Sequence, residues 1–165
     1  MRAQQILLAA WLGLSGLPGS GAEFRDYPGE PLLQGQPAAP KLASPAARRY
    51  RTQLRTQSAQ GPNFNGQYRI AFWGCGSQCL EWAVANLKDG AVWFAPTEYC
   101  AVPRQDAEGG THWIDFHSHS RLLFLYGCQM TLETACPGAD ELRRMAYVWT
   151  GGTARHLETR CVPSQ

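Results

Sequence analysis

Two cysteines stand four positions apart in the segment FWGCGSQCLEW, which runs from Phe72 to Trp82. Cys75 and Cys79 could form a redox-active pair, bind a soft metal ion such as Cu(I), or form a structural disulfide. Thioredoxin-type pairs have about two intervening residues and a helix N-terminus, whereas this pair lies between expected strands. The neighbouring glycines provide the backbone freedom of a tight chain reversal, which favours a structural disulfide.

The remaining cysteines point to further disulfides. The chain contains six cysteines, and an even number is typical of exported proteins whose thiols are oxidised in pairs. The sequence alone leaves the connectivity open. The distances along the chain suggest a local pair between Cys128 and Cys136, which by elimination leaves Cys100 with Cys161.

A second group of polar side chains lies in the segment THWIDFHSHSR. On an extended strand Asp115, His117 and His119 would point to the same side, where they could bind a metal ion or transfer protons. However, the chain is expected to turn at HSHS, and a turn breaks this alternation. We therefore expect exposed histidines, no resident metal and no cofactor. A metal site, if present, would use Cys75, Cys79, Asp115, His117 and His119.

The sequence contains none of the motifs that mark common nucleophilic or nucleotide-dependent enzymes. It has no G-x-S-x-G nucleophile elbow, no G-x-x-x-x-G-K-[ST] phosphate loop and no G-x-G-x-x-G dinucleotide turn. Ser118 and Ser120 adjoin histidines, but neighbours on a strand face opposite sides and do not make a catalytic triad. No catalytic residue is predicted, and a non-catalytic role is favoured over an enzymatic one.

Exposed cations and aromatic rings would allow the chain to bind a partner. Rigid rings provide contact area at little entropic cost, although most tryptophans of a small β protein lie in its core. The loop from Arg104 to Thr111 could add to such a surface. The predicted binding surface combines the arginines of an expected helix with two tryptophans: Arg48, Arg49, Arg51, Arg55, Trp82 and Trp113.

Residues 1–22 have the pattern of a signal peptide. Arg2 precedes an apolar run from Ile6 to Leu17, which is followed by a proline and small residues. The run is shorter than the roughly 20 residues of a membrane-spanning helix, so no stable membrane anchor is expected. Such a signal would direct the chain to the periplasm or the medium and would be cleaved before Glu23. This location agrees with the cysteine content of the chain.

Residue periodicity predicts the elements that position these side chains. Residues 23–43 contain four prolines and few large apolar side chains, so we expect an extended leader that lies on the surface. Residues 44–165 are expected to form a single β-rich domain. It begins with one short helix, in which Ser44 is the N-cap, Pro45 the first residue and Gly61 the C-terminal stop.

From Gly66 onward the apolar residues recur with a period of two, which predicts strands. Three hairpins are expected, closed by Asp89-Gly90, by HSHS and by Gly151-Gly152. The sequence thus predicts a mainly β fold, an antiparallel β-meander with one short N-terminal helix and disulfide staples. Its strands, about seven in number, are expected in QYRIAFW, LEWAVANL, AVWFAP, WIDF, SRLLFLYG, MAYVW and ARHLETR.

The charge balance points to no polyanionic partner. With 15 Lys and Arg against 13 Asp and Glu, the formal net charge is only +2, and nucleic-acid binding is not predicted. The bases are unevenly distributed, because residues 31–80 contain arginines but no acidic residue. This asymmetry predicts a basic face on the helix. The sequence does not specify an oligomeric state.

The run GPNFNGQYRIAFWGCGSQC, with the later SRLLFLYG and YVWTGGTARHLETR, resembles a group of small uncharacterised exported bacterial proteins. These carry an N-F-x-G-x-Y segment, a W-G-C-G-x-x-C segment, an S-R-L-L strand and a Y-x-W hairpin. The similarity covers residues Ala46 to Arg160, and the hairpins also resemble blades of β-propellers. The resemblance implies an exported protein with an all-β core, and it supplies no reaction, cofactor or catalytic residue.

These features lead to an expected function. We expect an exported, non-catalytic binding protein of the cell envelope, of the inhibitor or immunity type, whose partner is a protein or another envelope component. The alternative is an envelope protein that handles metal ions or thiol redox chemistry, using the Cys75/Cys79 pair and nearby histidines.

The signal pattern makes a first testable prediction. The mature protein should begin near Glu23 and should be recovered outside the cytoplasm, because signal peptidases cut after small residues. N-terminal sequencing of the exported protein checks this start. Recovery of a chain that retains Met1 in the membrane fraction would contradict it.

Overall fold

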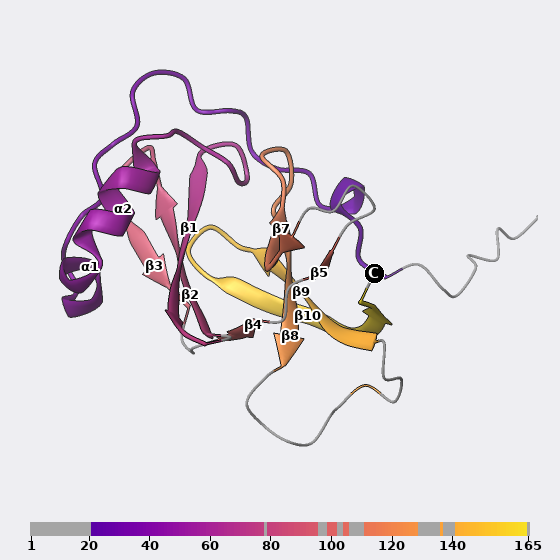
Figure 1. Ribbon diagram of the computed structural model, residues 1–165. Coiled ribbons are helices and arrows are strands. Elements are labelled where there is room, and N and C mark those ends of the chain that lie inside the picture. Colours follow the sequence, from indigo (N-terminus) through magenta and orange to yellow (C-terminus); the bar gives the residue numbers. More distant parts are fainter. Residues whose placement is uncertain are drawn as a thin grey trace, which may run out of the picture.

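The structure is a computed structural model of the chain, and it describes residues 21–77, 79–95, 99–101, 104–105, 111–128, 136 and 141–164. Three helical segments come first (Figure 1): the 3-10 turn η1 (Phe24–Asp26) and the helices α1 (Pro45–Arg49) and α2 (Arg51–Ser58). The described residues then form strands β1 (Tyr68–Gly76), β2 (Cys79–Asn86), β3 (Val92–Phe94), β4 (Tyr99–Ala101), β5 (Arg104–Gln105), β6 (Thr111–His112), β7 (Ile114–Phe116), β8 (Leu122–Cys128), β9 (Glu141–Trp149) and β10 (Ala154–Pro163).

Most of the strands belong to one antiparallel sheet. Its order is β1-β2-β4-β8-β9-β10, with β3 added to β2 and β7 added to β8. Strands β5 and β6 form a separate antiparallel pair. The predicted mainly β, antiparallel fold is confirmed. It departs from a simple meander at β4, a three-residue strand that pairs with both β2 and β8 and so joins the two halves of the sheet.

Each of the predicted strand segments contains a strand, and the three predicted hairpins form as the pairs β2–β3, β7–β8 and β9–β10. In the first, Gly90 has φ of +77°, and a Cβ there would collide with the carbonyl oxygen of Ala39. The turn therefore requires glycine for its backbone conformation and for the close approach of the leader. The strands that the sequence did not predict are β4, β5 and β6, which are three residues long or shorter.

One half of the sheet contains β1, β2 and β3, and the other contains β7, β8, β9 and β10. The apolar side chains form three clusters, one between the two halves and one on the outer face of each half. The central cluster joins β1 and β2 to β7, β8 and β9, and includes Ile70, Trp82, Leu123, Leu125 and Met145. A second cluster packs the opposite face of β1 and β2 against the helices, through Ala47, Leu54, Ala71, Trp73 and Ala83. The third covers the outer face of β8 and β9, where Leu122, Phe124, Tyr126, Leu142 and Ala146 lie under the leader. Figure 1 shows the helices beside β1–β3, away from β8–β10.

The helical segment is split, because the expected single helix is interrupted at Tyr50 and continues as α2. Its start agrees with the sequence, since Pro45 is the first residue and the Ser44 hydroxyl oxygen accepts a hydrogen bond from the Ala47 N–H at 3.0 Å. Ala47 and Leu54 are buried and pack the helices against the sheet. Tyr50 leaves the helix to stack on Trp73 of β1, with ring centroids 4.5 Å apart.

The leader, residues 23–43, runs along both halves of the sheet and is tied to their loops. Phe24 and Tyr27 pack against the third cluster, so the start of the leader contributes to the core, contrary to the expected purely surface position. Further along, backbone N–H groups donate to loop carbonyls, from Gly29 to His119 (2.7 Å), from Leu33 to Gly66 (3.0 Å), from Ala38 to Leu87 (2.7 Å) and from Lys41 to Gly90 (2.7 Å). The leader thereby links elements that do not pair with one another.

Strand β1 lies at an edge of the large sheet, where its outward N–H and C=O groups would be unpaired. Two side-chain amides take the place of a neighbouring strand. Asn63 donates to the Ile70 carbonyl at 3.1 Å and accepts from the Ile70 N–H at 2.8 Å. Gln57 of α2 forms the same pair of bonds with Phe72, at 3.0 and 3.2 Å. The edge is thus covered as far as Phe72.

In the part of the chain that the structure describes, no helix is long and apolar enough to cross a membrane.

The amide bonds to β1 give a prediction for stability. Asn63→Ala should lower the free energy of unfolding by about 1 to 3 kcal/mol, because both partly buried backbone groups of Ile70 lose their partner. Gln57→Ala should cost less, since its bonds are exposed to water. Chemical denaturation measures both. The control is Gln53→Ala, an exposed site on α2, where a change within about 0.5 kcal/mol is expected. Equal losses at Asn63 and Gln53 would contradict the role of the amides.

Candidate functional site

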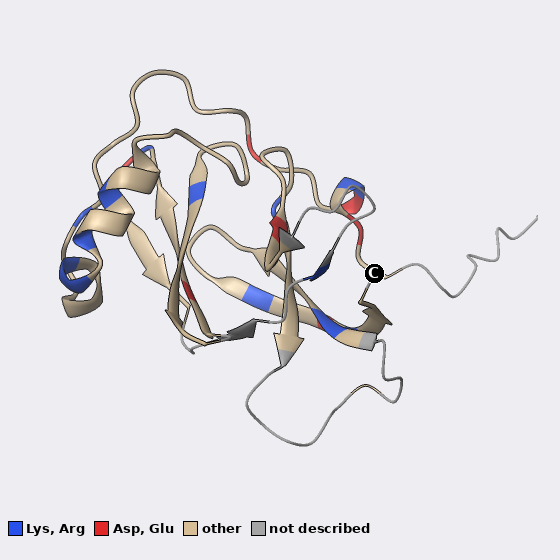
Figure 2. Ribbon diagram, viewed as in Figure 1, with Lys and Arg blue, Asp and Glu red and all other residues tan. Residues whose placement is uncertain are grey.

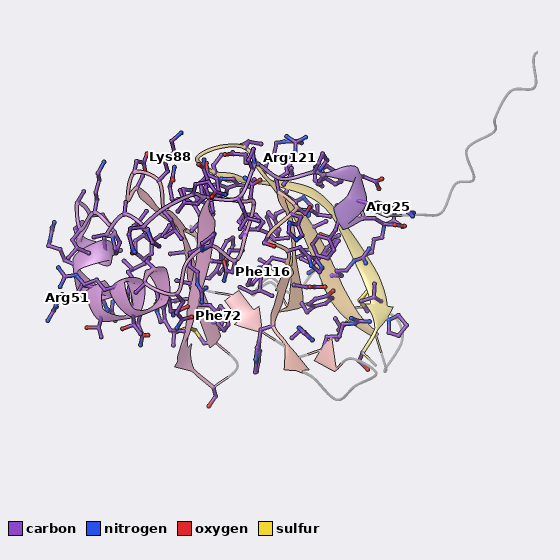
Figure 3. All side chains as sticks on the ribbon, turned by 90° about the horizontal axis from the view of Figure 1, so that it is seen from above. Arg25, Arg51, Phe72, Lys88, Phe116 and Arg121 are labelled. Carbon is purple, nitrogen blue, oxygen red and sulfur yellow. A yellow bond between two sulfur atoms is a disulfide. The ribbon has the colours of Figure 1, made fainter. Side chains whose placement is uncertain are left out.

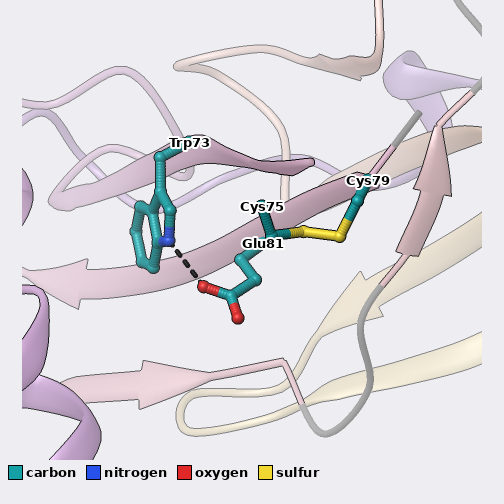
Figure 4. Close-up of a disulfide and its surroundings, with 4 residues drawn as sticks. All are labelled: Trp73, Cys75, Cys79 and Glu81. Carbon is teal, nitrogen blue, oxygen red and sulfur yellow. Dashed lines mark hydrogen bonds between the residues drawn. A yellow bond between two sulfur atoms is a disulfide. The ribbon is translucent and has the colours of Figure 1, made fainter. Parts of the chain in front are cut away.

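A disulfide joins Cys75 and Cys79 at the tip of the β1–β2 hairpin, with their Cα atoms 5.1 Å apart (Figure 4). The register of the two strands shifts between Gly74 and Gly76, and Gly76 has φ of +148°, where a side chain would be strained. The predicted pairing is confirmed. The bridge closes a chain reversal that glycine makes sterically accessible.

The hairpin is also attached to the helices by a small polar contact. The Trp73 indole N–H donates to a Glu81 carboxylate oxygen at 2.7 Å across the two strands (Figure 4). On the helix side, Tyr50 forms a hydrogen bond with Glu81, and this bond, together with desolvation, raises the pKa of the Tyr50 hydroxyl. The tip of the hairpin is therefore held by a covalent bond, and the strands directly behind the tip are held by hydrogen bonds and ring packing.

The second disulfide corrects the expected connectivity. It joins Cys136 to Cys161 of β10, with Cα atoms 5.7 Å apart, so the predicted pairs Cys128–Cys136 and Cys100–Cys161 are both wrong. In the backbone register of the sheet, Cys100 on β4 lies opposite Cys79 on one side and opposite Cys128 on the other. These juxtapositions join distant parts of the chain, and for that reason the spacing of the cysteines did not reveal them.

The residues proposed for metal binding or proton transfer are not gathered into a site. Asp115 lies on β7 and forms a hydrogen bond with Tyr126. His117 is exposed beside the ring of Phe24, with centroids 4.1 Å apart, and His119 is exposed in the predicted turn. Within the described residues, no group of three or more His, Cys, Asp or Glu side chains is arranged to hold a metal ion.

The predicted binding surface is divided by the fold. Its four arginines lie on or beside α1 and α2, where Arg48 donates to the Leu42 and Ala43 carbonyls and Arg49 lies over the ring of Tyr50. Figure 2 shows this basic group on the helices. Trp82 is only 4% exposed and belongs to the central core, so its assignment to a surface is wrong. Trp113 is half-buried and lines a hollow that contains no residue of either helix.

This apolar hollow adjoins the Cys75–Cys79 bridge and has a volume of about 310 Å³. Phe72, which is 41% exposed, is one of two large apolar side chains with high exposure among the described residues; the other is Leu32. Its place in the alternation with buried Tyr68 and Ile70 predicts a core position. It is nevertheless exposed, and it lines the hollow. The hollow is lined by Phe72, Trp73, Gly74, Gly76, Cys79, Leu80 and Trp113.

A larger cavity of about 570 Å³ lies between the leader and the outer face of β8 and β9. Phe124 and Tyr126 form its floor, and Arg144 and Arg104 lie over these two rings, with guanidinium carbons 4.6 and 5.7 Å from the respective centroids. Asp115 also lines the cavity. Figure 3 shows that the cavity residue Arg25 and the helix residue Arg51 lie at opposite ends of the molecule, so this cavity is separate from the basic helices.

The electrostatics of the cavity follow from partial burial. Burial first, and then the negative charge of Asp115, raise the pKa of the Tyr126 hydroxyl further above neutral pH. At the edge of the cavity, burial raises the pKa of Glu158, but the Ala22 N–H and Arg160 outweigh it and the net shift is downward. Glu158 is therefore ionised and bonded to Arg160 at 3.0 Å.

Sequence patterns indicated little of this cavity. The sequence suggested Asp115 only for metal binding or proton transfer. It suggested Arg104 only as the first residue of a loop that could add to a binding surface. The structure places Arg104 on β5, which pairs with β6 (Thr111–His112). Residues 106–110 lie outside the described part of the chain. Arg144 shows no distinctive local pattern. The signal that would have drawn attention to it is its place as a single arginine between Leu142 and Ala146 on an otherwise apolar strand face.

No protein-family model matches the chain, and neither a curated protein nor a solved structure matches it. No family membership is therefore assigned, and the resemblance to small exported bacterial proteins stays a prediction. The geometry of the hollow and of the cavity is the basis for the functions proposed below.

The disulfides give a prediction that distinguishes a structural disulfide from a redox-active cysteine pair. The Cys75→Ser, Cys79→Ser double variant should lose about 2 kcal/mol of stability, and the Cys136→Ser, Cys161→Ser variant about 3 to 4 kcal/mol, because the second bridge closes a longer loop. Chemical denaturation of each variant measures the loss. Alkylation of freshly exported protein without reductant, followed by mass spectrometry, should label neither Cys75 nor Cys79. Labelling at Cys75 would contradict a permanent staple.

Proposed function

We propose that this protein is an exported, non-catalytic binding protein of the cell envelope, of the inhibitor or immunity type. Its partner is a protein that inserts an apolar side chain into the hollow beside the Cys75–Cys79 bridge. The observation that carries the proposal is the exposure of Phe72 at the wall of this hollow, next to half-buried Trp113. Aromatic side chains in a concave apolar site are the usual anchors of protein interfaces.

The rigidity of the hairpin supports this role. Binding costs free energy when side chains and loops must be ordered, and a preorganised surface reduces that cost. Here the disulfide fixes the hairpin tip, and the bond from Trp73 to Glu81 fixes the strands behind it. The Gln57 amide covers the strand edge up to Phe72, so the hollow begins where the covered edge ends. A partner therefore meets a surface that is already formed.

Thiol redox chemistry or metal handling is the second candidate function. It is favoured by one observation, the exposure of Cys75 at the hairpin tip, which gives a reductant or partner thiol access to the bridge. Such a function would require the pair to cycle between thiol and disulfide, and each single Cys→Ser change would then abolish activity while stability changed little. The alkylation experiment on exported protein distinguishes this candidate from the binding protein.

The binding proposal is tested by changing the hollow and nothing else. Affinity capture from envelope extract first identifies the partner, and the affinity for the purified partner is then measured. Phe72→Asp and Trp113→Ala should each weaken binding by about tenfold or more, because anchor residues at interface centres contribute about 2 kcal/mol or more. Circular dichroism and the melting temperature establish that the variants are folded.

Two matched controls complete this test. Leu32→Asp makes the same kind of change at the other exposed large apolar residue, on the leader, and should leave the affinity unchanged. Replacement of Arg48, Arg49, Arg51 and Arg55 by Gln should also leave it nearly unchanged, because solvated charges contribute little individually. Loss of binding in the arginine variant, with normal binding in Phe72→Asp, would move the binding site to the helices and refute the hollow.

A further inference from the structure

The cavity between the leader and the outer face of β8 and β9 plays no part in the function proposed above. We propose that it binds an organic carboxylate with an apolar body, either a free small acid or the C-terminal carboxylate of a peptide. Its volume of about 570 Å³ lies within the usual range of ligand sites, about 300 to 1,000 Å³. Its lining combines a few charged groups with an apolar floor, which is also typical of such sites.

Arg144 is the first of two cations that face a ligand in this cavity. Its guanidinium lies over the ring of Phe124, so the ring occupies one planar face and leaves the N–H groups at the edge of the guanidinium as donors. The carboxylate of Glu158 is 4.0 Å away, and it is already bonded to Arg160 and to the Ala22 N–H. Glu158 therefore neutralises Arg144 only in part.

Arg104 is the second cation and lies over the ring of Tyr126, the other aromatic ring of the cavity. Among the described residues, no carboxylate lies within ion-pair distance of Arg104. The negative charge of Asp115 acts instead on the Tyr126 hydroxyl, whose pKa it helps to raise. Two arginines held by aromatic rings in this way can bind one carboxylate from two sides, since each guanidinium matches the geometry of a carboxylate.

The charge of the lining favours a single negative charge. Arg25 and Glu23 form an ion pair at 2.7 Å at the exposed rim and offset each other. Arg104 and Arg144 then exceed the remaining acid, Asp115, by one unit, which suits a carboxylate better than a doubly charged phosphate. Val162, Pro163 and the floor ring of Phe124 provide apolar area for the rest of the ligand.

The predicted signal cleavage bears directly on this site, because Ala22 and Glu23 both line the cavity. In a chain that begins at Glu23, the peptide N–H of Ala22 is absent from Glu158, and the new α-ammonium group lies at the cavity rim. That group adds a positive charge beside the ligand. The processed protein should therefore bind a carboxylate at least as well as the chain that retains Ala22.

The test uses exported protein and pairs of probes that differ only in charge. N-acetyl-phenylalanine and its primary amide represent the free acid, and a tripeptide ending in phenylalanine, with a free or an amidated C-terminus, represents the peptide. Calorimetry or chemical-shift titration should give saturable binding for at least one acid, and amidation should weaken it by about tenfold or more, because it removes charge-assisted hydrogen bonds. The tighter of the two acids identifies the source of the carboxylate. Inorganic phosphate should bind more weakly than that acid.

Variants then assign binding to the two arginines. Arg104→Gln and Arg144→Gln should each weaken the binding of the tighter acid by about tenfold. Arg104→Lys should restore only part of the lost affinity, because lysine keeps the charge without the paired donors. Arg155→Gln is the matched control, with the same change of charge at an exposed position near the other end of β10, and should bind normally. If Arg144→Gln fails to fold, the Arg104 variants carry the test, since no ion pair with a described residue is lost there.

Three results would overturn the proposal. The first is equal binding of an acid and its amide, which would show that the carboxylate is not recognised. The second is normal binding by Arg104→Gln in folded protein. The third is the absence of saturable binding of either acid at millimolar concentration. None of these results affects the partner-binding hollow, whose variants are read out with the protein partner.

Discussion

Strand β2 is covered on both faces, and the arrangement of the other elements depends on this constraint. Its larger side chains, Leu80, Trp82 and Val84, point to the central cluster, while Ala83 points to the helices. Large residues on one face require a second layer of sheet above them, and the small residue on the other lets a helix approach closely. The chain meets both requirements by passing through β4, which turns the second half of the sheet over the first.

The leader stabilises this arrangement from outside. Its N–H groups bond to loops of both halves of the sheet, and its first aromatic residues close the third cluster over β8 and β9. Where the layers fail to overlap, two concave surfaces result. One lies at the tip of the β1–β2 hairpin, beyond the point where Gln57 covers the strand edge. The other lies where the leader only partly covers the outer face of the second half.

Each concave surface lies next to a disulfide. Cys79 lines the apolar hollow, and Cys161 directly precedes Val162, which lines the arginine cavity. A disulfide beside a concave surface restricts the backbone there, which lowers the entropic cost of ordering that surface when a ligand binds. Such a disulfide can therefore increase affinity as well as stability. The two surfaces differ in chemistry, since one is apolar and the other combines arginines with aromatic rings. Both binding roles are proposals, and they rest on these two different linings.

The sequence determined those features that depend on neighbouring residues. Apolar alternation located the principal strands, Asp89-Gly90 and Gly151-Gly152 marked turns, and Ser44 and Pro45 marked the helix start. Cys75 and Cys79 could be paired because they flank one tight reversal. These features follow from backbone geometry over a few residues, which the local sequence specifies directly.

Features that depend on how distant segments meet were decided only by the tertiary structure. Cys136 pairs with Cys161 because of the position of β10 in the sheet, and Trp82 is buried because a second layer covers it. Phe72 has the same alternation as Ile70, yet it is exposed and lines the hollow at the hairpin tip. Arg104 and Arg144 come from different strands and meet only at the cavity. Burial and juxtaposition are properties of the packed layers, and a periodic pattern gives the face of a strand without giving what covers it.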